Sequence, residues 1–468
     1  MTAAMLARVP LDTELVVANP ATGEEIGRVP QHGPAAAPEV LAIAKRGAHA
    51  SAKLTRYERA QVLERTAGTL RERSEDLAQL IVREAGKTIQ QARKEVSRAA
   101  NTYMLSAEAA RSGGGEVIPF DAFESGQGRQ GWFTREPLGI ILAITPYNDA
   151  LNLVAHKLGP AIAGGNSVIL KPAQQTPLLA RTLVSIMRDN GLPDESVTVV
   201  HGGREFVQEL VQAREVRMIS FTGGFRTAEA ISAKAGLKRL SMELGGNAPV
   251  LVFEDADLMR AVEACVSGAF WAAGQNCVGV QRLLVHSSIY AAFRDGFVAA
   301  TEALRTGDPS NETTDVGPMI SEAAAEATLD SVTSAIGAGA RLLTGGTANG
   351  SFVSPTVLEN VPLNHSLCAD EIFAPVVILE SFDSYEEAIE LANQPEYALH
   401  AGVFTSNLQT ALSAAQDLEA GGVMINDSSD FRVDAMPFGG AKYGSMGREG
   451  VRFAYEEMTQ PKVVCIRP

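Results

Sequence analysis

The pattern of hydrophobic and polar positions changes twice along the chain and predicts three kinds of structure in turn. In VVANPATGEEIGRVP, residues 16–30, extended segments flank a turn at Pro20–Gly23, which predicts a hairpin. From about Ala35 to Ser112 the pattern is helical and rich in Ala, Glu, Lys and Arg, with a break expected at Gly86. The segments GGGEVIPFDA and GRQGWFTREPLG then predict two strands joined by a polar, glycine-rich turn.

From Ile140 onward, short apolar strands alternate with helical segments, as in ILAITP, SVILKP, VTVVHGG, RMISFTGG and APVLVF. This alternation is typical of a parallel sheet with helices on its faces. A second series of the same kind begins at about Leu251, and the chain ends in the strand-like KVVCIRP. The pattern therefore predicts an α/β fold. Because 468 residues exceed one ordinary core, we expect two or three domains.

Composition and charge narrow the classes of function. The hydrophobic fraction of 46% and the charged fraction of 20% are those of a soluble globular protein. A net charge of −15 argues against binding to nucleic acid or to an anionic membrane surface. No apolar run approaches a membrane span, and the N-terminal MTAAMLARVPLD lacks the apolar stretch of a signal peptide. We therefore expect a cytoplasmic protein without a nucleic-acid or membrane partner.

The four cysteines, Cys265, Cys277, Cys368 and Cys465, form no C-x-x-C pair, and the seven histidines lack metal-site spacing with them. We expect neither a disulfide framework nor a metal site. Cys277 differs from the others because it lies among small, nearly uncharged residues in AAGQNCVGVQ. This setting suits either a buried core thiol or a nucleophile that a substrate and a cofactor can both approach.

Two strand ends offer groups that suit a phosphate or another anion. In ISFTGGFRTAEAI a strand runs through Gly223 and Gly224 into a helix, whose first N–H groups attract anions. Such glycines also occur in α/β turns for geometry alone, and the dinucleotide pattern G-x-G-x-x-G is absent. Lys171 ends SVILK at the carboxyl edge of the sheet, where open α/β sheets bind ligands. A solvated lysine at a strand end is the simpler alternative.

Further polar residues stand in apolar surroundings. If the helix in ITPYNDALNLVAHKLGP begins near Asn148, then Asn148, Asn152 and His156 share one face. Such a stripe either lines a wet cavity or contains a core histidine that a backbone carbonyl satisfies. Glu243 precedes a Gly-Gly turn and an apolar strand in SMELGGNAPVLVF. Burial there would raise its pKa and suit a general base, whereas an exposed residue at a strand start is the alternative.

Taken in order, TPYN, LKPAQQTP, FTGG, MELGGNAP, GQNC, DEIFAPV and PFGG resemble the aldehyde dehydrogenase superfamily over nearly the whole chain. The resemblance implies the aldehyde dehydrogenase fold, with a Rossmann-like cofactor domain, an α/β catalytic domain and a small β oligomerisation flap. The expected ranges are 1–114 and 138–245 for the cofactor domain, 246–445 for the catalytic domain, and 115–137 with 446–468 for the flap. A homodimer or homotetramer is also implied.

The resemblance also implies roles for single residues. Cys277 would attack the aldehyde, the Asn148 amide and the Cys277 N–H would stabilise the oxyanion, and oxidation would leave a thioester. Glu243 would activate water to release the acid. NAD or NADP would be the cofactor, and the neutral Gln174, where NAD-preferring members usually carry Glu, permits NADP without showing a preference. The implied cofactor-binding residues are Ile144, Thr145, Pro146, Tyr147, Lys171, Gln174, Gly223, Gly224, Leu244, Glu371 and Phe373.

The expected substrate is a short polar or anionic aldehyde, similar to phosphonoacetaldehyde, lactaldehyde or succinate semialdehyde. The resemblance places Arg98, His156 and Arg432 at the substrate tunnel, where guanidinium groups suit an anion. Periodicity alone makes Arg98 a solvated surface charge, and Asn276 stands where some phosphonate-acting relatives have arginine. The expected substrate-binding residues are Arg98, Asn152, His156, Asn276, Ser429 and Arg432.

Two rival functions make different demands on the same residues. A CoA-acylating aldehyde dehydrogenase would share Cys277 but has no need of a base that activates water, so Glu243 counts against it. A non-catalytic structural or binding protein on the same fold would be expected to lose Cys277 or Glu243, and both are present. One departure from the family pattern, the order Gly444-Ser445 in place of Ser-Gly, has no account at the level of sequence.

Overall fold

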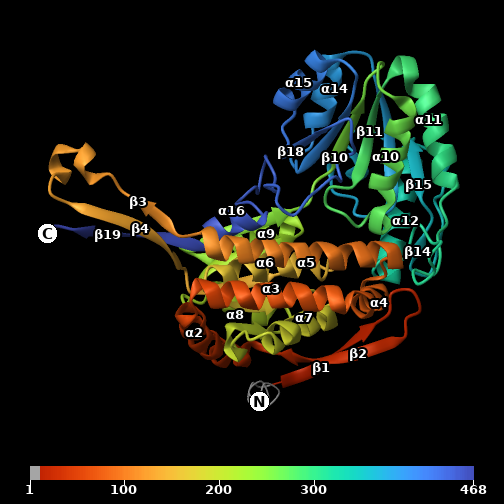
Figure 1. Cartoon of the computed structure of the whole chain (residues 1–468). Coiled ribbons are helices and arrows are strands. Elements are labelled where there is room, and N and C mark those ends of the chain that lie inside the picture. The colour runs from red at the N-terminus through yellow and green to blue at the C-terminus, as the bar shows by residue number, and fades with distance from the viewer. Residues whose placement is uncertain (1–10) are drawn as a thin grey trace.

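Two mainly parallel sheets, each covered by helices on both faces, organise the computed structural model of the chain, which describes residues 11–468 (Figure 1). Residues 1–10, which make up most of the segment considered above for targeting, lie outside the described residues. No helix within residues 11–468 is long and apolar enough to cross a membrane.

The first sheet has five parallel strands in the order β7-β6-β5-β8-β9. The chain enters at the middle strand, β5, adds β6 and β7 on one side, and then adds β8 and β9 on the other. Ligands of such sheets bind beyond the carboxyl ends of the strands, where the order reverses. The strands are β5 (Ile140–Ile144), β6 (Ser167–Lys171), β7 (Val197–Val199), β8 (Val216–Gly223) and β9 (Arg239–Leu244).

Helices bury both faces of this sheet, which explains why its central strand, β5, is apolar at every position. Ile141 and Ala143 pack into the core under one helical layer, and Ile140 and Leu142 pack into the core under the other. One layer holds α3 (Arg56–Glu72), α4 (Ser74–Ala85), α5 (Ile89–Ser112), α6 (Asn152–Ala163) and α7 (Pro177–Asp189), and the other holds α2 (Ala37–Lys53), α8 (Arg204–Gln212) and α9 (Phe225–Ala235).

The helical pattern expected from about residue 35 is confirmed, although it is divided into four helices. The break expected at Gly86 is confirmed, because α4 ends at Ala85 and Gly86 forms its C-cap. A further break separates α2 from α3, where Thr55 and Glu58 form a capping box at the start of α3.

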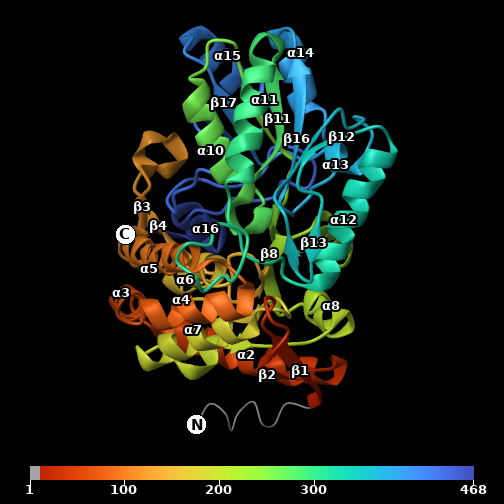
Figure 2. The ribbon, with the colours of Figure 1, turned by 90° about the vertical axis from the view of Figure 1, so that its right-hand side faces the viewer.

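The second sheet has seven strands in the order β12-β15-β16-β11-β10-β17-β18, and only β12 runs antiparallel to its neighbour. Figure 2 shows β11, β16 and β17 of this sheet above the helices that cover the first sheet. The strands are β10 (Ala248–Val252), β11 (Val280–His286), β12 (Arg341–Thr344), β15 (Thr356–Glu359), β16 (Val376–Phe382), β17 (His400–Phe404) and β18 (Gly422–Ile425). One face is covered by α10 (Leu258–Phe270), α11 (Ser287–Glu302), α12 (Glu322–Gly337) and α13 (Ser366–Ala369). The other face is covered by α14 (Tyr385–Asn393) and α15 (Leu408–Asp417). Outside this sheet, β13 (Ala348–Asn349) pairs with β14 (Phe352–Val353).

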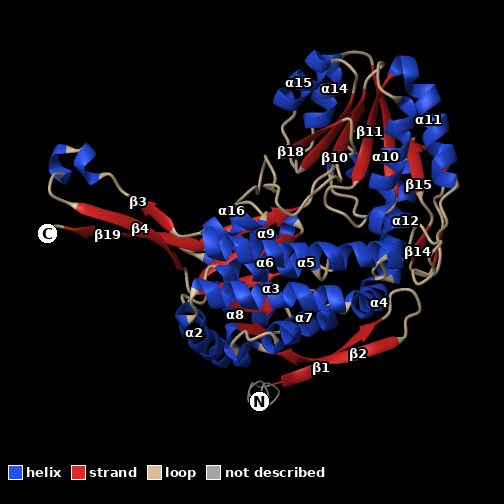
Figure 3. Cartoon of the chain, viewed as in Figure 1, coloured by secondary structure: helices blue, strands red, loops and turns tan. Residues whose placement is uncertain are grey.

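A three-stranded antiparallel sheet extends away from the body of the molecule (Figures 1 and 3). It confirms the two strands expected after the helical region, β3 (Gly115–Val117) and β4 (Gln130–Pro137). The strand expected at the C-terminus is β19 (Thr459–Ile466), which follows α16 (Val451–Glu457) and pairs with the whole of β4. The N-terminal hairpin is also confirmed, as β1 (Leu11–Ala18) and β2 (Glu25–His32).

The prediction that α6 begins near Asn148 is wrong. The helix begins at Asn152, because the Glu95 carboxylate from α5 accepts hydrogen bonds from the N–H groups of Leu151 (2.7 Å) and Asn152 (3.2 Å). A carboxylate at these free N–H groups caps the helix there. Asn148 therefore lies in the turn before the helix and does not share a helical face with Asn152 and His156.

Candidate active site

Cys277 and Asn148 line the same cavity, of about 340 Å³, between the two large sheets. Asn148 follows the carboxyl end of β5, and Cys277 precedes the amino end of β11. The cavity therefore lies where the first sheet is expected to bind ligands. Arg98, Asn276 and Arg432 also line it, so three of the six expected substrate-binding residues reach the cavity.

A strained turn holds Cys277 at the wall of this cavity. Ala272 and Ala273 adopt left-handed backbone angles, with φ of 51° and 55°, which are uncommon outside glycine and strain the backbone. The buried Gln275 amide fixes the turn, since it donates to Ala272 O (2.9 Å) and accepts from Ile320 N–H (2.9 Å). The small residues of AAGQNC thus permit a tight turn that presents the thiol.

Gly274→Ala is expected to lower kcat/KM by about 10- to 100-fold, because misplacing a reacting group by about 1 Å can cost this much. Gly274 has φ of 69°, and a methyl group added there would lie 2.1 Å from the carbonyl oxygen of Ala374. Gly236→Ala is the matched control, since Gly236 has φ of 66° but has open space around it. Equal losses of kcat/KM in the two variants would contradict a positioning role for the turn.

The Cys277 thiol is half-buried and resists ionisation. Burial raises its pKa, and the nearby Glu371 carboxylate raises it further, while the Arg432 guanidinium acts in the opposite direction. Only the thiolate is a strong nucleophile, so reaction requires a group that removes the thiol proton. The surroundings of Cys277 therefore favour a protonated thiol until a base acts on it.

Glu243 has the features of such a base. It is the penultimate residue of β9 and is 2% exposed, and its pKa is raised well above the ordinary value by burial and then by the neighbouring Glu449 carboxylate. One carboxylate oxygen accepts from the Glu449 N–H at 3.1 Å, and the other has no hydrogen-bond partner within residues 11–468. A buried carboxylate with a free oxygen and a raised pKa can take up a proton near neutral pH.

Arg432 and Lys157 both bind the buried carboxylate of Glu449, at 3.0 Å and 2.8 Å. Arg432 is one of the residues expected to bind the substrate, but the Glu449 carboxylate already compensates part of its positive charge. Arg432 also stacks on the Phe438 ring, at 3.7 Å from the ring centre. Neither Glu449 nor Lys157 was identified from the sequence; a lysine within the apolar LNLVAHKLGP was the available signal.

Arg98 is not the solvated surface charge that periodicity indicates. It forms ion pairs with Asp149 and Asp434, both at 3.1 Å, while it lines the cavity. Asp434 also bonds Asn152 (3.2 Å) and His156 (3.1 Å). Burial lowers the pKa of His156 although the Asp434 carboxylate acts in the opposite direction, which disfavours a positive charge on this ring.

Three of the expected substrate-binding residues are buried outside the lining of the cavity: Asn152, His156 and Ser429. The Ser429 hydroxyl donates to the backbone carbonyl of Val278 at 2.8 Å. Asp427 and Asp430, which flank Ser429 in the same loop, do line the cavity and were not identified from the sequence. Ser428, one position before Ser429, lines the cavity instead. Which residue of a loop faces a cavity cannot be read from a single sequence.

A second cleft, of about 500 Å³, opens beyond the carboxyl ends of β5 and β6. Ile144, Lys171 and Gln174 line it, and burial lowers the pKa of Lys171. Gly224 is the N-cap of α9, and a methyl group added at Gly224 would meet open space. The free N–H groups of α9 are therefore open to an anion in the cleft.

Glu371 lies near enough to Cys277 for its carboxylate to raise the pKa of the thiol, but neither Glu371 nor Phe373 lines this cleft. Burial raises the pKa of Glu371 to about 8, and one of its carboxylate oxygens has no hydrogen-bond partner in the described chain. The Phe373 and Tyr147 rings meet edge to face, with their centres 5.9 Å apart.

Leu244 contacts Gly444, whose φ of 81° favours glycine. This conformation gives the order Gly444-Ser445 a structural reason.

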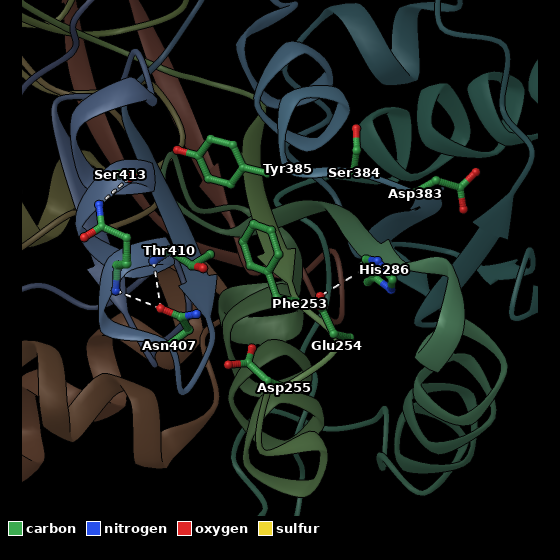
Figure 4. Close-up of a pocket in the computed structure, with 11 residues that line it drawn as sticks. Phe253, Glu254, Asp255, His286, Asp383, Ser384, Tyr385, Asn407, Thr410 and Ser413 are labelled. Carbon is green, nitrogen blue, oxygen red and sulfur yellow. Dashed lines mark hydrogen bonds and ion pairs between the residues drawn. The ribbon is translucent and has the colours of Figure 1, made fainter.

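Another cavity, of about 430 Å³, lies at the opposite ends of the second sheet, beyond the carboxyl ends of β10, β11 and β16 (Figure 4). Its lining includes Glu254, Asp255 and Asp383, and Asp255 already accepts hydrogen bonds from Thr405 and Ser406. Within residues 11–468, neither Cys277 nor Glu243 lines this cavity. Within residues 11–468 no cluster of three or more His, Cys, Asp or Glu side chains is suited to a metal ion.

Comparison with known proteins gives a consistent result. The model of the Aldehyde dehydrogenase family matches residues 9–464. Aspartate-semialdehyde dehydrogenase 1 of Pseudomonas canavaninivorans is 57% identical over 466 residues, which cover 100% of this chain and 99% of that protein. The 3-sulfolactaldehyde dehydrogenase of Priestia aryabhattai is 42% identical over 411 residues, 88% of this chain and 86% of that protein. The crystal structure of a glyceraldehyde-3-phosphate dehydrogenase from Methanocaldococcus jannaschii, complexed with NADP, has a TM-score of 0.93 at 39% identity and covers 98% of this chain and 100% of that one.

Proposed function

Since these matches span nearly the whole chain, the protein belongs to the aldehyde dehydrogenase family, and we propose that it oxidises a short polar or anionic aldehyde to the carboxylic acid with NAD or NADP. The observation that carries the proposal is the shared cavity of Cys277, Asn148 and two arginines. A thiol and a side-chain amide suit addition to an aldehyde, and the guanidinium groups suit an anionic substituent.

In the proposed reaction the Cys277 sulfur adds to the aldehyde carbon, and the Asn148 amide with the Cys277 N–H donates hydrogen bonds to the resulting oxyanion. Glu243 accepts the thiol proton, directly or through a water, and passes it to solvent before the hydrolysis step. Once oxidation has produced a thioester on Cys277, Glu243 accepts a proton from the attacking water, which yields the acid and the free thiol. The burial of Glu243 and the neighbouring Glu449 carboxylate favour proton uptake in both steps.

The cleft beside β5 and β6 fits a dinucleotide, which supplies the hydride acceptor when it is bound. Lys171 and Gln174 would hold the adenosine side, and Gly223 with Gly224 leaves room for a pyrophosphate at the start of α9. The free oxygen of Glu371 would accept hydrogen bonds from the ribose next to the nicotinamide. Ile144, Thr145, Pro146, Tyr147, Leu244 and Phe373 complete the proposed contact set.

The charges of the substrate cavity favour one class of short aldehyde. The lining residues include three cations and three carboxylates, and Asp427 and Asp430 form no ion pair with any described residue. An aldehyde with both an anionic and an ammonium group would match both signs. The 57% identity to a protein named aspartate-semialdehyde dehydrogenase supports an amino-acid semialdehyde as the first candidate.

Steady-state kcat/KM values for a panel of aldehydes test this proposal. We expect aspartate semialdehyde, succinate semialdehyde, phosphonoacetaldehyde and lactaldehyde to be ranked above hexanal, with the best of them at least about tenfold better, because one charge-assisted hydrogen bond is worth that much. Asp430→Asn should weaken aspartate semialdehyde more than succinate semialdehyde, which lacks the ammonium group. A higher kcat/KM for hexanal than for the polar and anionic aldehydes would contradict the proposal.

The same assay separates the rival functions. A CoA-acylating enzyme would form acyl-CoA when CoA is added and would release little free acid. A non-catalytic protein would release no NADH or NADPH on mixing with any aldehyde. Release of the free acid with unchanged rate in the presence of CoA is the result expected here.

The homodimer or homotetramer implied by the resemblance also remains a proposal. The β3-β4-β19 sheet leaves β19 as an edge strand and exposes Val117, Val463 and Ile466. Such edges and apolar side chains are usually covered by pairing with another chain. Light scattering in solution distinguishes a dimer from a tetramer.

A further inference from the structure

The cleft beside β5 and β6 has an unusual charge for this chain. Four cationic residues line it: Lys171, Arg204, Arg226 and Lys234. Within residues 11–468, no acidic residue lines it. The whole chain has 55 acidic and 40 basic residues, so a cleft with only positive charge contrasts with the average surface. The polar neutral groups in it are mainly the amides of Gln174 and Gln208.

Most of these cations have no counter-charge in the protein. Lys171, Arg204 and Arg226 form no ion pair with any residue that the structure describes. Lys234 bonds the neutral side chain of Gln208. Positive charges that gather without a carboxylate repel one another, and an anion in the cleft would relieve that repulsion.

Arg204 and Arg226 also stand where helices disfavour cations. Arg204 is the first residue of α8, and Arg226 is the second residue of α9. The start of a helix carries a partial positive charge, so a cation there costs about 0.3–1 kcal/mol. Helices α8 and α9 pack against each other, which brings both starts to the same cleft. Folding alone therefore gives no reason for arginine at either position.

A dinucleotide offers an anion of the required kind at this place. Sites for NAD usually present a carboxylate to the 2′-hydroxyl of the adenosine ribose, whereas an arginine accommodates the 2′-phosphate of NADP. The cleft has Gln174 and no carboxylate. We propose that Arg204 and Arg226 bind the 2′-phosphate, and that the enzyme prefers NADP to NAD. This inference rests on the proposed function, which places the adenosine half of the cofactor beside Lys171 and Gln174.

Direct binding tests the inference without turnover. NADPH and NADH are titrated into the protein by fluorescence, and 2′,5′-ADP and 5′-AMP by calorimetry. We expect NADPH to bind at least about tenfold more tightly than NADH, and 2′,5′-ADP more tightly than 5′-AMP, since charge-assisted bonds to phosphate are worth about that factor each. The NADPH affinity should fall steeply with salt, whereas the NADH affinity should fall less.

Variants assign the effect to the two arginines. Arg204→Ala and Arg226→Ala should each weaken NADPH about tenfold while NADH changes less than about threefold. Arg204→Lys and Arg226→Lys should restore part of the NADPH affinity, because they restore the charge. Arg260→Ala is the matched control and should change neither affinity, because Arg260 is an exposed arginine at the start of α10, which covers the second sheet.

The outcomes separate two kinds of failure. If NADPH and NADH bind equally to the wild-type protein, or if the two alanine variants weaken both equally, the 2′-phosphate site is wrong while the proposed function stands. If the wild-type protein binds neither dinucleotide, the proposed function itself fails.

Discussion

Cys277→Ala is expected to lower kcat by about 10⁴-fold or more while leaving dinucleotide binding and folding unchanged. Without a nucleophile no covalent intermediate forms, and removal of a catalytic nucleophile typically costs this much or more. The side chain is half-buried at the wall of the cavity, so its loss leaves no large void in the core. Stopped-flow measurement of the first NADH or NADPH released per active site gives the clearest reading, because the wild type should show a burst and the variant none.

The other cysteines supply the control for Cys277. Cys465 is exposed on β19, and Cys265 is completely buried in the core beside the second sheet. Cys465→Ala should keep full activity, and labelling with an aldehyde followed by mass spectrometry should find the adduct on Cys277 alone. A Cys277→Ala protein that still releases a burst would show that the nucleophile lies elsewhere.

Much of the fold could be predicted because strand burial is visible as apolar runs and helix burial as periodicity. The hairpin, the break at Gly86 and the C-terminal strand are confirmed for this reason, and the aldehyde dehydrogenase fold is confirmed by the structural match. The start of α6 was missed because Glu95, which caps the helix, lies more than fifty residues earlier in the chain. Contacts at that separation leave no local signal.

Prediction of the candidate site from the sequence is limited in the same way, because its charged residues meet only in the folded chain. The family resemblance assigned the roles of nucleophile, oxyanion donor and base to Cys277, Asn148 and Glu243, and these assignments stay predictions. The partners Asp149, Asp434 and Glu449 were missed, although they decide how much charge Arg98 and Arg432 can offer a substrate. A charge is predictable from one residue, but its compensation depends on residues that meet only in the folded chain. The distribution of domains proposed from the resemblance stays a prediction.

Glu243→Gln is expected to lower kcat by about 10²- to 10³-fold, because a general base contributes about that much to a rate. The pH profile provides the sharper test. Glu243 acts in its ionised form, and burial followed by the Glu449 charge raises its pKa well above the ordinary value of 4.5. The kcat of the wild type should therefore fall as the pH drops through this raised pKa, in a range where ordinary carboxyl groups are still ionised. The Gln variant should lose that limb of the profile.

The stability of the Glu243→Gln protein tells a catalytic carboxylate from a structural one. A carboxyl group with a raised pKa in the folded state costs free energy whenever it is ionised, so its replacement by a neutral amide removes that cost at alkaline pH. The amide oxygen can still accept the hydrogen bond from the Glu449 N–H. We therefore expect the free energy of unfolding at pH 8, measured with urea, to stay equal or rise while kcat falls. A variant that loses activity and stability together would indicate that Glu243 holds the fold in place, and that another group activates the water.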